Sequence, residues 1–407
     1  MPPALRSLTA LAVTAVTLTG GAACSQAAPG HMMYGYATID QVVLMDGERE
    51  LARIDRDMGL RSDPDKSEAA WTADGKYFAF FSIPQYFLLD SLGNDVGMDK
   101  QSLTVVNTSG HIAVYPCPNC FRLVAVGNTF WAEGNTRAQI ERLDPAATNA
   151  AFTRVNLPGV PLMTVTLPEL LGGVDNAGLI AQTFDSGAVD NRERRRLFFA
   201  APDRSATLVG DYRTIGRIRA AVATSSADKG QVLLSSYPGG GMCNAHATLW
   251  TLTTQMPQLA KTDNSAMITA GATPEFGMRL NGPWWGADGH FHVAASTWAC
   301  GESNGVTSQA DMISNIQPWK MFRLDGSKWV SENIEATSAQ PLGGDTILIH
   351  QTATCAGGKK LNEQPGIPDR TPSDLACKSG PLILQTGAER KQISPAAIAV
   401  WAQPPTD

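Results

Sequence analysis

Histidine is the residue type here best suited to chemistry, because the chain has only six and an imidazole can hold a metal or move a proton near neutral pH. His290 and His292 are two residues apart on a predicted strand, so their side chains point to the same side. A metal site would need His246 or His350 to converge with them, together with a carboxylate. A histidine that is packed or hydrogen-bonded within the fold is the commoner arrangement. We therefore expect no bound metal.

Aromatic residues at predicted strand ends offer a second kind of chemistry, which is ligand binding by stacking. Tyr237, Trp298 and His350 each lie at or just beyond the end of a predicted strand. Their rings could stack on a sugar or grip an extended peptide. His246 follows a glycine-rich stretch and joins them as a candidate ligand-binding residue. The alternative for Trp298 is that its ring only covers apolar surface beside Cys300.

Known catalytic motifs do not indicate a reaction for this protein. It contains no G-x-S-x-G, H-E-x-x-H, G-x-G-x-x-G or P-loop pattern. A carboxylate pair for glycoside hydrolysis cannot be chosen, because the distance between the two groups in space defines that chemistry. The sequence predicts no cofactor, and it favours a binding role over an enzymatic one.

A recurring phrase shows how these residues are positioned. Residues 71–82 read WTADGKYFAFFS, residues 285–296 read WGADGHFHVAAS, and residues 226–236 are a looser copy. Turn glycines recur with gaps of 51 to 59 residues, at Gly75, Gly127, Gly178, Gly230, Gly289 and Gly344. Turn residues before short strands at such a period are typical of a β-propeller.

The strands that follow these turns are predicted to be the inner strands of successive blades. They are residues 77–81, 129–132, 179–183, 231–235, 291–295 and 346–350, and one further step reaches residues 396–401. This predicts an all-β, seven-bladed β-propeller, with six or eight blades as alternatives. The last blade needs three more strands, which residues 37–45, 48–54 and 68–71 can supply, so strands from both termini would close the ring and remove exposed sheet edges.

The phrase at residues 71–76 resembles the Trp-Ser-Pro-Asp-Gly-Lys sequence that opens blades in TolB-like propellers, with Ala73 in place of proline. The resemblance to this WD40/TolB type of repeat covers the chain thinly, since two copies are good and one is fair. It implies the fold and says little about activity, because propellers carry many unrelated functions.

Long irregular segments follow the predicted inner strands. They are residues 83–100, 184–191, 237–247, 297–317 and 351–380. Taken as connections between first and second strands, they would all emerge on one face of the propeller. Repeat proteins commonly concentrate insertions on the face used for binding. The alternative is neutral loop growth, which costs little free energy.

Six cysteines remain once Cys24 is set aside, and an even number in an exported protein indicates disulfides. Fifteen pairings are possible; we expect Cys117–Cys120, Cys355–Cys377 and Cys243–Cys300. The first pair is placed in a turn between third and fourth strands, on the same face as the long segments. A redox or zinc role for this Cys-Pro-Asn-Cys sequence is disfavoured, because β-like runs flank it and no second Cys-x-x-Cys exists.

The N-terminus has the features of a targeting segment. Arg6 precedes an apolar stretch at residues 8–18, and a small-residue run ends at Cys24. We expect a signal peptide over residues 1–24, a short linker over 25–33 and one propeller domain over 34–407. The segment before Cys24 resembles a lipobox, with Gly21 where leucine is usual, so Cys24 is the predicted lipidation site. The competing interpretation is ordinary cleavage after Ala27.

Composition and charge narrow the possible partners. The formal net charge is −6 with no sustained basic stripe, which disfavours nucleic acid binding. The sequence therefore predicts an exported protein, held on the outer face of a membrane by its lipid or secreted. It would act as a binding module for an extracytoplasmic protein, peptide or glycan. The alternative is a secreted polysaccharide hydrolase or lyase with its site at the propeller channel.

Overall fold

The computed structural model describes most of the strands and the turns between them. The described residues are 33–38, 40–55, 69–82, 88–89, 95–96, 101–118, 120–134, 140–160, 168–174, 176–184, 194–212, 217–223, 231–237, 247–253, 259–268, 276–286, 288–301, 305, 317–351 and 379–404. They all belong to one compact unit, His31–Asp407. The pattern of contacts along the chain divides this unit from Met1–Gly30. The predicted signal peptide and Cys24 lie outside the described residues. In the described part, no helix is long and apolar enough to span a bilayer.

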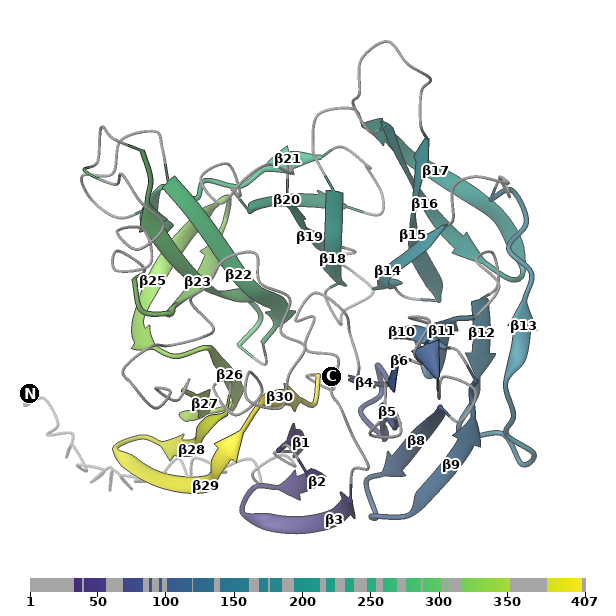
Figure 1. The fold of residues 1–407 in the computed structure, drawn as a ribbon, viewed down its shortest axis with the longest axis horizontal. Helices are drawn as coiled ribbons and strands as arrows, with labels where there is room; N and C mark the ends of the chain where they lie inside the picture. The colour runs from purple at the N-terminus through teal and green to yellow at the C-terminus, as the bar shows by residue number, and fades with distance from the viewer. Residues whose placement is uncertain are drawn as a thin grey trace, which may run out of the picture. The chain divides into compact units, whose positions relative to one another are not determined.

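The described residues form seven four-stranded antiparallel sheets, which we call blades 1 to 7 (Figure 1). Blade 1 contains β4 (Ala69–Trp71), β5 (Tyr77–Ser82), β8 (Ser102–Asn107) and β9 (Ile112–Pro116). Blade 2 contains β10 (Phe121–Val126), β11 (Thr129–Glu133), β12 (Ile140–Leu143) and β13 (Thr153–Val155). Blade 3 contains β14 (Glu169–Val174), β15 (Ala177–Phe184), β16 (Arg194–Ala201) and β17 (Arg204–Tyr212).

The other four blades repeat the pattern. Blade 4 contains β18 (Arg217–Ala223), β19 (Gln231–Tyr237), β20 (Thr248–Thr253) and β21 (Ala260–Lys261). Blade 5 contains β22 (Phe276–Trp285), β23 (Phe291–Ala299), β24 (Lys320–Asp325) and β25 (Lys328–Glu335). Blade 6 contains β26 (Ser338–Gly343), β27 (Thr346–His350), β28 (Gly380–Thr386) and β29 (Glu389–Ala397). Blade 7 contains β30 (Ala399–Ala402), β1 (Met33–Ala37), β2 (Gln41–Asp46) and β3 (Arg49–Asp55). A two-stranded sheet, β6 (Leu88–Leu89) with β7 (Asp95–Val96), and the short helix η2 (Ser265–Met267) complete the set.

The first strand of each blade lies at the centre of the ring. Contacts join β26, β30, β4, β10, β14, β18 and β22 in that order, and β23 of blade 5 contacts β26. Apolar side chains from neighbouring blades form the core between them, as where Val232 and Leu234 of β19 join Leu179 of β15. The seven-bladed fold predicted from the repeat is confirmed.

Closure of the ring by both termini is also confirmed. β30 pairs antiparallel with β1, so blade 7 takes one strand from the C-terminus and three from the N-terminus (Figure 1). The backbone N–H of Gln403 donates to Met33 O at 2.9 Å. Trp71 Nε1 donates to Trp401 O at 3.0 Å, which ties blade 7 to blade 1.

The predicted positions of two sets of strands were wrong. The runs after the turn glycines, such as Tyr77–Ser82, are second strands, because β4 lies further in. Both strands beside the turn are apolar and buried on two faces, so the repeat locates the turn without showing which side of it is central. Residues 68–71 supply the first strand of blade 1 rather than a strand of the closing blade. Residues 396–401 cover the end of β29 and most of β30.

The turn itself explains why the phrase recurs. Gly75 has a φ of 65°, a left-handed conformation that glycine adopts without steric cost. Thr72 Oγ1 donates to Asp74 Oδ1 at 2.7 Å, and the N–H of Lys76 donates to the same oxygen at 3.1 Å. A carboxylate before a left-handed glycine therefore holds the connection between first and second strands.

The long segments share one side of the ring, although their predicted place in the blade was wrong. They leave from the ends of second strands (β5, β15, β19, β23 and β27) and lead to third strands. Blade-to-blade links lie on this side too, because a link as short as Ile398, between β29 and β30, cannot cross a blade. Cys117 and Cys120 lie in such a link, between β9 and β10, rather than in the predicted turn between third and fourth strands. We call this side the loop face and the opposite side the turn face.

Candidate functional site

Two of the four predicted ligand-binding residues are buried side chains. Trp298, on β23, is 1% exposed and lies across from Gly277 of β22. His350, at the end of β27, is 3% exposed, and its Nε2–H donates to Ala397 O at 2.8 Å. Burial lowers the pKa of His350 to about 4, so the ring is neutral at physiological pH. Tyr237 ends β19 with its side chain outside the described residues, and His246 lies outside them altogether.

A second histidine is held between two carboxylates. His292 is fully buried on β23, and its Nε2 lies 2.8 Å from Asp288 Oδ1 while its Nδ1 lies 3.2 Å from Glu332 Oε2. The ring stacks on Trp284, with centroids 5.6 Å apart and planes at 13°. Burial alone would lower the pKa of His292, but hydrogen bonds to the two carboxylates outweigh it and raise the pKa to about 9. His292 is therefore an imidazolium at neutral pH.

The cluster of His292 with Asp288 and Glu332, which we call the histidine clamp, has a structural role and is not a reactive centre. Both ring nitrogens donate to carboxylates, so neither has a lone pair with which to bind a metal or accept a proton. His292 also holds the pKa of Asp288 below its ordinary value, against the effect of burial. In the described ranges no group of three or more His, Cys, Asp or Glu is placed to hold a metal ion.

Comparison of the two good repeat copies shows how the sequence builds this clamp. Position by position, Gly286 replaces Thr72 and His292 replaces Phe78, while the turn aspartate is kept. In blade 1 the turn aspartate, Asp74, accepts a hydrogen bond from the hydroxyl of Thr72. In blade 5 a Cβ at Gly286 would collide with Asp288 and His292. The two changes therefore belong together, and they were visible in the aligned copies.

No sequence pattern pointed to Glu332 as a partner of His292, because the two residues are 40 positions apart. It lies where the register of β25 shifts against β24, and the neighbouring Asn333 has a left-handed φ of 56°. An irregularity of this kind re-aims a side chain, and here Glu332 reaches the imidazole.

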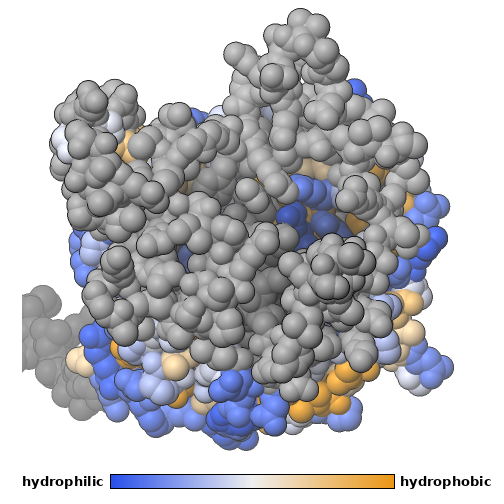
Figure 2. All heavy atoms as spheres, viewed as in Figure 1, coloured by the Kyte–Doolittle hydropathy of each residue, from blue (hydrophilic) through white to orange (hydrophobic). Residues whose placement is uncertain are grey.

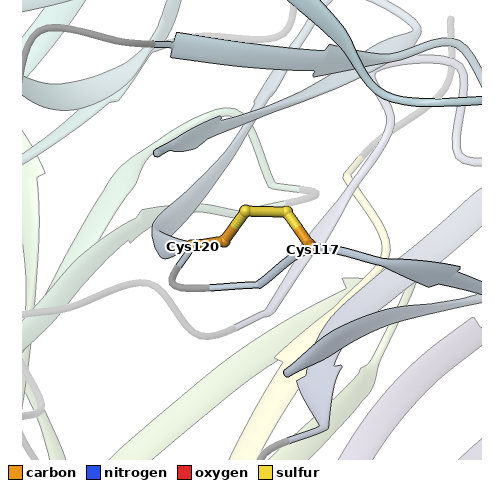
Figure 3. The surroundings of a disulfide bond; sticks show 2 residues. All are labelled: Cys117 and Cys120. Carbon is orange, nitrogen blue, oxygen red and sulfur yellow. A yellow bond between two sulfur atoms is a disulfide. The ribbon is translucent and has the colours of Figure 1, made fainter. Parts of the chain in front are cut away.

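A second polar cluster lies on the loop face, at the start of β10. Cys117 and Cys120 form a disulfide with their Cα atoms 5.5 Å apart, which closes the link from blade 1 to blade 2 (Figure 3). Two residues later Arg122 has a φ of 38°. Such a conformation costs a non-glycine residue on the order of 1 to 3 kcal/mol and persists only where the surroundings enforce it. Cys300 is also disulfide-bonded; its predicted partner Cys243 lies outside the described residues, as do Cys355 and Cys377.

The Arg122 side chain joins blade 2 to blade 3. It is 8% exposed, its Nη1 donates to Leu170 O at 3.0 Å, and its Nε lies 3.9 Å from Glu133 Oε1. The same Glu133 oxygen accepts the backbone N–H of Leu170 at 2.5 Å. The Glu133 carboxylate therefore lies between the Arg122 guanidinium and the backbone N–H of Leu170, while the guanidinium donates one hydrogen bond to the Leu170 carbonyl. This network holds the starts of β10 and β14 together at the loop face.

Comparisons with known proteins leave the family open. No protein-family model matches the chain, and no curated protein matches it. Among solved structures, a protein from Bacteroides uniformis described as a 6-phosphogluconolactonase is 9% identical, with 91% of this chain and 99% of that chain covered and a TM-score of 0.44. AztD from Citrobacter koseri is 10% identical, with 91% and 97% covered and a TM-score of 0.43. YCF48 bound to a D1 peptide is 11% identical, with 80% and 79% covered and a TM-score of 0.38. The function must therefore be argued from the site itself.

Proposed function

We propose that this protein is an extracytoplasmic binding module whose loop face holds a protein, a peptide or a cell-envelope glycan. One observation carries the proposal. The five second strands that lead into long segments all end on the loop face, where the Cys117–Cys120 link also lies. Long segments gathered on one side of a rigid repeat scaffold commonly form a binding surface.

The described loop-face residues support binding in preference to catalysis. The disulfide and the Arg122 network fix strand starts in advance, which lowers the entropy lost when a partner is bound. The two histidines whose pKa values are strongly shifted are both buried and engaged by the protein, His350 by a carbonyl and His292 by carboxylates. Neither is presented to a substrate, so the hydrolase or lyase alternative gains no support from them.

Export and anchoring complete the proposal. The N-terminal segment and the TolB-like turn phrases fit an exported lipoprotein that is lipidated at Cys24 and lies on the outer face of the membrane. Replacing Cys24 with Ser should move the protein from the membrane fraction to the soluble extracytoplasmic fraction, as measured by fractionation and immunoblotting. Membrane retention unchanged by the substitution would contradict the anchor.

The binding role can be tested by affinity capture from intact cells, with the Cys24→Ser protein as bait. A second bait has residues 352–378 replaced by a short Asn-Gly turn, which is feasible because His350 pairs directly with Leu382. It should lose the captured partner while its thermal unfolding midpoint stays within a few degrees. The matched control inserts a short Gly/Ser stretch between Pro202 and Asp203, in the turn-face hairpin of β16 and β17, and should keep the partner.

Capture that survives in the shortened bait and fails in the turn-face control would contradict a loop-face site. A purified protein that depolymerises envelope polysaccharide, with no captured partner, would support the enzymatic alternative instead.

A further inference from the structure

The fourth strand of each described blade is an outer edge, because it pairs with the third strand on one side only. Natural proteins commonly place charged side chains on such edges, which discourages pairing with another chain. Six of these seven edge strands contain at least one Lys, Arg, Asp or Glu; they are β3, β13, β17, β21, β25 and β29. The seventh, β9, reads Ile-Ala-Val-Tyr-Pro, and residues 101–121 around it contain no charged residue either. β9 is therefore the edge that lacks this protection.

Apolar side chains on β9 are exposed to solvent. Val114 is 59% exposed and Ile112 is 40% exposed, and both lie on the same face of blade 1. The other large apolar side chains that are exposed in the described structure, Leu208 and Val330, lie singly on β17 and β25. In Figure 2 a hydrophobic area lies on the rim where Figure 1 places β9. Adjacent exposed apolar residues are a feature of interaction sites, whereas single ones are common on any surface.

The backbone of the same two residues also points outward. At one end of the ladder between β8 and β9, the N–H of Cys117 donates to Gln101 O at 3.0 Å. Hydrogen-bonded pairs alternate along an antiparallel ladder, so the odd-numbered residues of β9 bond to β8. The N–H and C=O groups of Ile112 and Val114 therefore face away from the blade, and no described residue bonds to them.

We propose that β9 pairs antiparallel with β9 of a second copy of this chain, so that two blades join into one continuous sheet. A strand that pairs with itself gives a two-fold symmetric contact, which is the commonest symmetry of protein dimers. In such a contact each side chain meets side chains of the same strand, so charges of one sign would repel, and β9 has none. The contact uses the outer edge of blade 1 and not the loop face, so this inference goes beyond the proposed function and does not depend on it.

The sequence of β9 selects one register, with Ala113 of each copy on the two-fold axis. Ile112 then exchanges both of its outward hydrogen bonds with Val114 of the second copy, and the reverse exchange occurs across the axis. Moving the axis to Val114 would set Ile112 opposite Pro116, which has no N–H to donate. Moving it to Ile112 would set Val114 opposite Gly110, whose N–H already donates within the turn between β8 and β9.

The side chains agree with this register. On the exposed face, Ile112 of each copy lies beside Val114 of the other, which makes an aliphatic pair on either side of the axis. On the axis itself the two Ala113 residues form a pair without hydrogen bonds, where the backbones approach most closely and a small side chain fits. A contact of one short strand buries little surface, so the dimer should be weak, with a dissociation constant in the micromolar range.

Sedimentation velocity over a range of concentrations tests the pairing with the purified Cys24→Ser protein. The dimer should persist or strengthen as salt rises from about 50 to about 500 mM, because salt screens the repulsion between two negative chains while the β9 contact is uncharged. Val114→Lys should raise the dissociation constant at least about tenfold, because it sets an ammonium group against Ile112 of the second copy. The matched control, Val330→Lys, makes the same change at the exposed apolar residue of β25 and should alter the constant less than about twofold.

A mixture of two variants tests the register. Ile112→Glu alone should weaken the dimer as Val114→Lys does. The two variants mixed should form a heterodimer, because the introduced carboxylate of one copy lies opposite the introduced ammonium of the other. This heterodimer should weaken as salt rises, unlike the wild-type dimer. Val114→Lys mixed with wild type is the control and should pair less tightly.

Both positions are exposed, so the variants should melt at the wild-type temperature. Should Val114→Lys melt early, Val114→Pro replaces it, because proline removes an outward N–H that the blade does not use. A monomer at every concentration, equal weakening by Val330→Lys, or no heterodimer in the mixture would overturn this inference. So would a protein that stays monomeric and binds an extended apolar peptide at β9. Capture of a partner through the loop face should be unchanged in Val114→Lys, so the two proposals fail independently.

Discussion

At the scale of single residues, two buried histidines are held in opposite charge states. His350 donates to a carbonyl and is kept neutral by burial, with its pKa lowered to about 4. His292 donates to two carboxylates and is kept charged, with its pKa raised to about 9. The partners that each ring meets, rather than burial alone, decide its charge.

His292 should make stability fall on the alkaline side. Its folded pKa of about 9 lies above the unfolded value near 6.5, so its contribution is complete below pH 6.5 and is lost as pH rises through 9. The difference corresponds to at most about 3 kcal/mol of unfolding free energy. Urea unfolding at several pH values between 6 and 9.5 measures the fall.

The control for this prediction rebuilds blade 5 on the pattern of blade 1. Glu332 follows Ser331, the last regularly paired residue, as Val114 follows Ala113 in β9. The variant is therefore Gly286→Thr/His292→Phe/Glu332→Val. Its unfolding free energy should be nearly flat over this pH range. If the variant keeps the wild-type slope, His292 is not the group that titrates.

At the scale of elements, the Cys117–Cys120 link fixes how β9 passes into β10. Closing a loop this short removes unfolded-state entropy worth about 2 kcal/mol. Replacing both cysteines with Ser should therefore lower the unfolding free energy by about this amount in urea. Cys300 is also disulfide-bonded, so the substitutions are a cleaner probe than a reductant. A double variant as stable as wild type would contradict a stabilising role for this disulfide.

The sequence predicted the architecture well and the interior of the site poorly. The Asp-Gly turn requires a left-handed residue at Gly75, so its period could be counted along the chain. The order of strands within a blade could not be counted, because β4 has only three residues and is as apolar as β5. Contacts such as Arg122 with Leu170 and His292 with Glu332 join residues 48 and 40 positions apart, and they depend on the register between strands.

At the scale of the whole molecule, blade 7 controls how strongly the ring resists opening during unfolding. Its first strand comes from one end of the chain and its other three from the other end. The chain runs covalently from each blade to the next. Within blade 7, the strand from the C-terminal end is joined to the strands from the N-terminal end by the β1–β30 ladder. A ladder of backbone hydrogen bonds should resist opening more than packing between neighbouring blades does.

A circular permutant tests this directly. Gln403 and Met33 are hydrogen-bonded neighbours, so a short Gly/Ser linker can join residues 404 and 33, with new termini placed between residues 56 and 68. Blade 7 then becomes one continuous hairpin series, and only packing between blades 7 and 1 closes the ring. The permutant should fold and bind as wild type does, but it should unfold faster in concentrated urea, by about tenfold for each 1.4 kcal/mol of lost barrier. Equal unfolding rates would show that the β1–β30 ladder breaks only after the rate-limiting step, and that ring closure by the termini adds no kinetic stability.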